Sequence, residues 1–176
     1  SEEEEDIVIG DGGSREDQRW DSIVGVLESI LMDDSFSDAQ EEYCVQHCHH
    51  FDDSDENKLV YTSIYKNYTD MIESRIESEL TMAIEGFTMA ELSSMLEERE
   101  GEICGDIWDM LMTIGDFAEF KNLMLAYKVQ AQQQAGMRQQ QVTASSSFLD
   151  AAVSTSQASF EGLAPLVTNL SSNGHL

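Results

Sequence analysis

Large apolar residues recur at spacings of three and four from Trp20 to Tyr127, and the 176 residues contain a single proline. Such spacing puts apolar side chains on one face of an α-helix. Proline interrupts helices, so its near absence favours long ones. No segment alternates apolar and polar residues as a half-buried strand does. The sequence therefore predicts an all-α protein.

Six apolar segments follow one another, and turn or capping residues separate them. Because Asp, Ser and Thr side chains accept hydrogen bonds from free amides at helix starts, Asp34 or Ser35 is expected to cap the second helix and Thr88 the fourth. Six amphipathic helices are enough for one helical core. The predicted helices cover Trp20–Leu31, Phe36–His50, Lys58–Ile84, Met89–Leu96, Glu102–Ile114 and Phe117–Lys128.

Both ends of the chain differ in composition from this middle part. Residues 1–19 are acidic and are predicted to form a disordered arm, and residues 20–130 form the six-helix domain. Residues 131–176 are rich in Gln and Ser, with few charges, and are predicted to be a disordered low-complexity tail. The alternative for the apolar residues scattered in this tail is a transient helix or a docking peptide.

The formal net charge is −26. A phosphate backbone or an anionic membrane surface would be repelled, so neither nucleic acid nor membrane is an expected partner, whereas a basic protein surface is. No apolar run reaches the roughly 18 residues of a spanning helix, and the acidic start does not resemble a signal peptide. Three cysteines suggest a reducing compartment.

The acidic stretch "FDDSDENKLVYTSIY", residues 51–65, raises the question of a calcium loop. An EF-hand loop needs glycine at position 6 and a bidentate glutamate at position 12. Counting from Asp53, these positions hold Lys58 and Ile64; counting from Asp52, position 12 is Ser63. The preferred interpretation is that the acidic run starts the third helix, where carboxylates complement the positive helix end.

A second possible metal site is "YCVQHCHHF", where Cys44, His47 and Cys48 share one helix face. A structural zinc site normally uses two separate segments, and only Cys104 lies elsewhere. Buried packing is the favoured interpretation, and we predict no metal site and no cofactor. No phosphate-binding loop, nucleophile elbow or catalytic triad is visible, so the protein is not expected to be an enzyme.

The segment "IWDMLMTIGDFAEFKNLMLAY", residues 107–127, has more large apolar residues than one narrow helix stripe can bury. One interpretation places these helices at the centre of the bundle. The other gives part of the surplus to a groove for an amphipathic helix of a partner, as methionine-rich surfaces often provide. Both interpretations can hold for different faces of the same helix.

Three blocks of the sequence resemble the binder-of-Arl-two (BART) family. They are "IVGVLESILMDDSF", "FDDSDENKLVYTSIYKNY" and "GDIWDMLMTIGDFAEFKNLMLAY", in this order, and the resemblance covers residues 20–128. It implies a six-helix bundle of BART type that acts as an effector of Arf-like small GTPases two or three. Such effectors recognise the GTP-bound form, take its N-terminal leucine-rich helix into a hydrophobic cleft and touch its switch regions.

Carried over to this chain, the resemblance places the groove on the third, fifth and sixth helices. It also implies a protein that is monomeric when free, in the cytoplasm, the mitochondrial intermembrane space, the centrosome or ciliary base, or the nucleus. The alternative function is an acidic module that binds basic proteins through charge, like a histone chaperone. The expected groove residues are Tyr61, Ile64, Tyr65, Tyr68, Ile72, Trp108, Leu111, Met112, Phe117, Phe120 and Met124.

Overall fold

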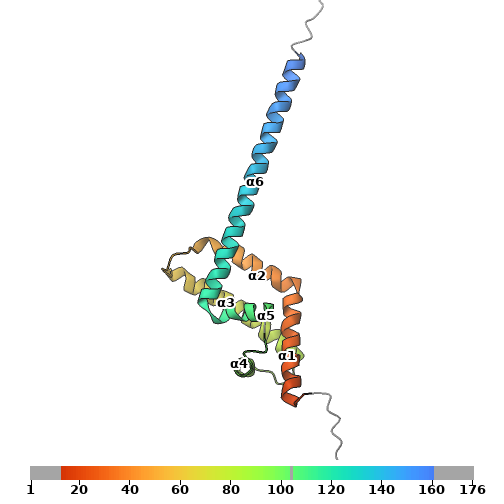
Figure 1. Cartoon of the computed structure of the whole chain (residues 1–176), viewed down its shortest axis with the longest axis vertical. Helices are drawn as coiled ribbons and strands as arrows, with labels where there is room; N and C mark the ends of the chain where they lie inside the picture. Colours follow the sequence, from red (N-terminus) through yellow and green to blue (C-terminus); the bar gives the residue numbers. More distant parts are fainter. Residues whose placement is uncertain (1–12, 104, 161–176) are drawn as a thin grey trace, which may run out of the picture. The chain divides into compact units, whose positions relative to one another are not determined.

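The computed structural model describes residues 13–103 and 105–160, and these contain six α-helices, a short 3₁₀ turn and no strand (Figure 1). The all-α prediction is confirmed. Residues 1–12 of the predicted arm, residues 161–176 of the predicted tail, and Cys104 lie outside the described residues. The elements are α1 (Arg15–Met32), α2 (Asp34–His47), η1 (Cys48–His50), α3 (Leu59–Ala83), α4 (Met89–Glu98), α5 (Asp106–Gly115) and α6 (Phe117–Phe160).

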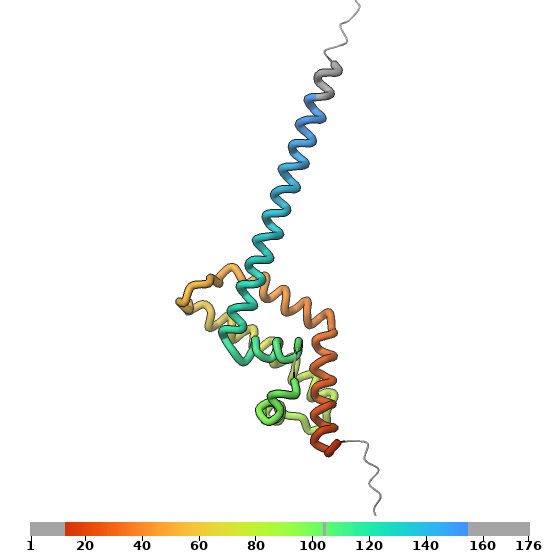
Figure 2. The backbone as a smooth tube through the Cα atoms, in the orientation of Figure 1, coloured from red at the N-terminus to blue at the C-terminus, as the bar shows by residue number. Residues whose placement is uncertain are grey.

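The chain divides into two compact units, and the boundary lies within α6, between Ala131 and Gln132. The first unit contains α1 to α5 and the first part of α6. In it, α3 contacts α1, α2 and α5, and α1 also contacts α2 and α5. Figure 2 shows the yellow-green backbone of α3 running through the middle of this unit.

Helix α3 supplies the central stripe of the core. Its buried side chains repeat every three or four residues, which is the spacing of one helix face. None of them is more than 5% exposed. They are Tyr61, Ile64, Tyr68, Ile72, Ile76 and Leu80.

Helix α1 begins at Arg15, earlier than the apolar pattern indicated, because a capping box precedes it. The Ser14 hydroxyl accepts a hydrogen bond from the Asp17 amide at 3.2 Å, and the Asp17 carboxylate accepts one from the Ser14 amide at 3.1 Å. The last residues of the predicted disordered arm are therefore helical. Trp20, Ile23 and Leu27 of α1 then face the core.

The cap of α2 is Asp33 and not Asp34 or Ser35 as expected. Its carboxylate accepts a hydrogen bond from the Ser35 amide at 2.8 Å. The same carboxylate pairs with Arg75 of α3 at 2.5 Å, so one side chain both starts α2 and ties it to α3. The predicted cap of α4 is confirmed, since the Thr88 hydroxyl accepts from the Glu91 amide at 3.2 Å.

Two arginines fasten α1 to the α4 region. Arg19 donates to the Glu91 carboxylate at 2.9 Å and to the Glu85 carbonyl at 3.2 Å. Arg99 lies 2.6 Å from the Asp17 carboxylate, and its guanidinium is stacked 5.7 Å from the Trp20 ring centre. The hydrogen bond from Arg99 lowers the pKa of Asp17 below its usual value.

Helix α5 starts later than expected, at Asp106, because Gly105 has a φ of +66°, a conformation that other residues rarely adopt. Ile103 is nevertheless buried in the connection before it. The described part of helix α6 extends to Phe160, far beyond the expected Lys128. Gln, Ala, Met and Arg favour helix, and α6 contains no proline, so low sequence complexity does not stop the helix here.

The second unit begins at Gln132. Its described part continues α6 to Phe160, and every side chain described in it, up to Ser154, is exposed. Part of the predicted low-complexity tail is thus helical but buries no core of its own. No helix among the described residues is long and apolar enough to cross a bilayer.

We expect Tyr68→Phe to lower the free energy of unfolding by about 1 kcal/mol. The Tyr68 hydroxyl accepts from the Gln40 amide at 2.9 Å and is 2.9 Å from the Thr113 hydroxyl, and the change leaves Gln40 without this partner. Urea denaturation followed by circular dichroism measures the loss.

Tyr127→Phe is the matched control, because the Tyr127 hydroxyl makes no hydrogen bond to any described residue. It removes the same oxygen from a half-buried tyrosine and should change stability little. Equal stability losses in the two variants would contradict the role assigned to the Tyr68 hydroxyl.

Candidate functional site

Two hollows lie beside α5 and share two side chains, Trp108 and Met112. The α4 hollow has a volume of about 390 Å³ and is also lined by Leu96, Leu111 and two glutamates of the α4 region. The α6 hollow has a volume of about 380 Å³ and is also lined by Leu123 of α6. Both volumes are at the lower end of the range for ligand pockets. We call the two hollows together the α5 surface.

The α5 surface exists because α5 is apolar on more than one side. Ile107 and Met110 point into the core and are 7% and 4% exposed. Trp108, Leu111 and Met112 are only half-buried. Residues four apart lie on the same helix face, so Trp108 and Met112 stand one above the other. Their side chains form the wall that the two hollows share.

The core holds α5 from its inner side. Thr113 lies 2.9 Å from the Tyr68 hydroxyl and donates to the Met110 carbonyl at 2.6 Å. The Tyr65 hydroxyl donates to the Ile114 carbonyl at 2.8 Å. Burial raises the pKa of both tyrosines, so these hydroxyls keep their protons at neutral pH. Polar contacts on the inner side thus fix which face of α5 turns outward.

Six of the eleven expected groove residues are buried in the structure. They are at most 5% exposed, because the α3 stripe and the start of α6 pack against each other. They are Tyr61, Ile64, Tyr68, Ile72, Phe120 and Met124.

The other five expected groove residues are half-buried. Trp108, Leu111 and Met112 meet at the α5 surface. Tyr65 and Phe117 pack against each other, with ring centres 5.4 Å apart, and line neither hollow. The structure therefore brings three of the eleven residues together at the α5 surface, and which of the eleven contact a partner stays a prediction.

Sequence reasoning missed Leu96 and Leu123. Each follows or precedes a buried methionine, Met95 or Met124, in the chain. Consecutive residues of a helix point about 100° apart, so when one large apolar side chain is fully buried its neighbour tends to lie at the edge of the buried face. That signal was present in the sequence.

Acidic side chains surround the apolar floor of the α5 surface. Glu97 and Glu100 line the α4 hollow, and Asp109 and Glu119 line the α6 hollow. No lysine or arginine among the described residues lines either one. The site is an apolar surface with a negative border.

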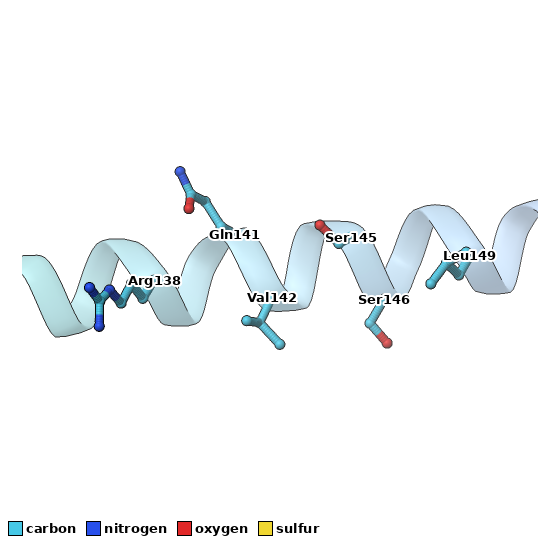
Figure 3. Close-up of a pocket in the computed structure, with 6 residues that line it drawn as sticks. All are labelled: Arg138, Gln141, Val142, Ser145, Ser146 and Leu149. Carbon is cyan, nitrogen blue, oxygen red and sulfur yellow. The ribbon is translucent and has the colours of Figure 1, made fainter.

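Two other surfaces are weaker candidates. A hollow of about 310 Å³ between α2 and α3 has Phe36 and Met71 in its wall, and its one cation, Arg75, is already paired with Asp33. Figure 3 shows a stretch of α6 between Arg138 and Leu149, where all the labelled side chains come from a single helix. One helix face encloses nothing, so the stretch of α6 does not match the α5 surface as a site.

The acidic stretch after Phe51 is a loop, not the first turn of a helix as interpreted from the sequence. Lys58 precedes α3, whose first turn contains no acidic residue. Asp52 pairs with Lys58, and this contact, with the Ser54 hydroxyl, holds the pKa of Asp52 well below its usual range. Lys121 and Lys128 of α6 donate to the Ser54 and Phe51 carbonyls at 2.6 Å and 2.5 Å. Lysine ammonium groups thus bind one carboxylate and two carbonyls of this loop.

The cysteine and histidine cluster lies mostly inside. Cys44 is 0% exposed, and burial raises the pKa of its thiol to about 12, so the metal-binding thiolate is not formed at neutral pH. His47 packs against Tyr43 with ring centres 4.4 Å apart. Among the residues that the structure describes, no group of three His, Cys, Asp or Glu side chains could hold a metal ion.

Comparison with known proteins assigns the chain to a family. The family described as "The ARF-like 2 binding protein BART" matches residues 19–133. A Gallus gallus protein named "ADP-ribosylation factor-like protein 2-binding protein" is 44% identical over 117 residues, 66% of this chain and 75% of the relative. Proteins of the same name from Mus musculus and Homo sapiens are each 39% identical, over 73% and 66% of this chain and 78% and 72% of their own lengths.

We expect calcium and zinc to leave the thermal unfolding midpoint of this protein unchanged. The carboxylate of Asp52 is paired with Lys58, and the thiol of Cys44 is protonated and buried, so neither offers a free ligand. Calorimetric scans with each metal, and with a chelator as the control, measure the shift. A saturable rise of several degrees with either metal would contradict this interpretation of the two clusters.

Proposed function

Since this chain belongs to the BART family of Arf-like 2 binding proteins, we propose that it is a non-enzymatic effector that binds the GTP-bound form of an Arf-like small GTPase, type two or three. The α5 surface is the proposed site. The GTPase would place the leucine-rich face of its N-terminal amphipathic helix there.

The observation that supports this proposal is the pair of neighbouring hollows that share the apolar side chains of Trp108 and Met112. A helix presents apolar side chains at i, i+3, i+4 and i+7, so consecutive anchors can enter neighbouring hollows. Methionine is flexible and adapts to differently shaped side chains, which suits a wall between two hollows. Leu96, Leu111 and Leu123 complete the apolar lining.

The energetics fit a binding module. Burying three or four Leu or Ile side chains contributes roughly 5–10 kcal/mol before the costs of association are subtracted. Dependence on GTP follows if nucleotide exchange frees the N-terminal helix from the body of the GTPase. The effector then binds one state of a two-state partner and so shifts the partner's equilibrium.

Binding through charge alone is the competing function. It is less well supported, because the two side chains that both hollows share, Trp108 and Met112, are apolar. We propose that the chain acts as a monomer. The cytoplasm, mitochondrial intermembrane space, centrosome or ciliary base, and nucleus are the compartments where a tagged chain would be sought by microscopy.

We expect the protein to capture an Arf-like GTPase loaded with a non-hydrolysable GTP analogue at least tenfold better than the GDP-loaded form. Only the first form offers its helix for docking. Affinity capture with each loaded form, quantified by immunoblot, measures the ratio. Equal recovery of both forms would contradict the proposal, and loss of capture between low and physiological salt would favour the charge-only alternative.

Trp108→Arg is expected to abolish that capture, because it places a bulky cation where both hollows need an apolar wall. Circular dichroism must show that the variant is still folded. Met32→Arg, at a residue 84% exposed at the end of α1, is the matched control and should retain capture. Undiminished capture by a folded Trp108→Arg variant would remove the α5 surface from the proposed site.

A further inference from the structure

We propose that the α5 surface selects amphipathic helices that have lysine or arginine on both borders of their apolar face. This inference rests on the proposed function, because it takes a docking helix as given. It adds the chemistry by which one such helix is distinguished from another.

The acidic border is divided between the two hollows. Glu97 and Glu100 lie on the α4 side, and Asp109 and Glu119 lie on the α6 side, with Trp108 between the pairs as part of both walls. A helix resting its apolar stripe on α5 would thus have two carboxylates on each side. Cations on both margins of the stripe would complement them.

The four border carboxylates have no partner within the described part of the chain. None makes an ion pair or a side-chain hydrogen bond with a described residue. By contrast, Asp17, Asp33, Asp52, Asp70 and Glu91 are all paired with a lysine or arginine. The four carboxylates at the α5 surface can therefore pair with a cation that a partner supplies.

The chain has few cations left to neutralise this border. It contains nine lysine and arginine side chains, and seven make ion pairs or hydrogen bonds elsewhere in the first unit. Lys121 lies between the lining residues Glu119 and Asn122 in sequence, but it donates to the Ser54 carbonyl at 2.6 Å. A docking helix must therefore bring its own positive charge, and an acidic helix would meet only like charges.

The test uses two synthetic peptides of about 16 residues, or four helical turns. Both have the same Leu and Ile residues at i, i+3, i+4 and i+7, and they differ only in having lysine or glutamate at the flanking positions. Binding to the full chain is measured by fluorescence anisotropy. We expect the lysine peptide to bind about tenfold more tightly, since four exposed charge pairs of modest strength add up to such a factor.

Two variants of the full chain separate the border from the total charge. The border variant is E97Q/E100Q/D109N/E119Q. The control variant is D21N/E28Q/D38N/E77Q, which neutralises four exposed acidic residues on α1, α2 and α3. Both change the net charge by the same amount, so a long-range field affects them equally. We expect the border variant to lose the preference for lysine and the control variant to keep it.

An equal preference in both variants, or no preference in the natural chain, would overturn the inference. If the natural chain captures the GTP-loaded GTPase but binds both peptides equally, the inference fails and the proposed function stands. If it captures no GTPase and binds neither peptide, the proposed function fails as well.

Discussion

The packing of aromatic rings around Phe120 is the interaction on which the first unit depends. The ring of Phe120 lies 5.7 Å from Phe51, 4.9 Å from Tyr65 and 4.8 Å from Tyr68, measured between ring centres. These rings come from the loop before α3, from α3 itself and from α6, so one cluster joins three separate segments. Such contacts add to the free energy of area burial. The tyrosines of this cluster also hold α5 through their hydroxyls, and the orientation of the α5 surface follows from it.

Most lysine and arginine side chains are used for contacts within the first unit, whereas some apolar side chains remain open at the α5 surface. Lysines and arginines form ion pairs or hydrogen bonds between α1 and the α4 region, between α2 and α3, and between the acidic loop and α6. Exposed ion pairs of this kind contribute little individually to stability. Their larger effect is on the other carboxylates. Because these cations are already paired, the four carboxylates at the α5 surface have no lysine or arginine partner among the described residues.

Much of the fold could be predicted from the sequence, because helix faces follow directly from apolar spacing. The α3 stripe and the Thr88 cap are examples. Start and end points were harder. The capping box at Ser14 starts α1 earlier than predicted, and the positive φ of Gly105 starts α5 later. Residues with high helix propensity continue α6 beyond Lys128.

The site was only partly predictable, because spacing cannot decide which of several apolar faces a neighbouring helix covers. Phe120 and Met124 have the same periodicity as a groove stripe, yet both are 0% exposed. The acidic stretch after Phe51 was predicted to start a helix but is a loop, because its conformation depends on contacts with residues far away in the sequence. The lysines that bind it are Lys121 and Lys128, about 70 residues away in sequence, and only tertiary structure brings them there.

The acidic border of the α5 surface has a consequence for how the protein behaves when crowded with its own copies. Because Trp108 and Met112 are apolar and only half-buried, they would favour association with the same surface of a second copy. Two copies that met through this patch would press four uncompensated carboxylates against four others. Mutual repulsion would oppose association of two copies through this apolar patch.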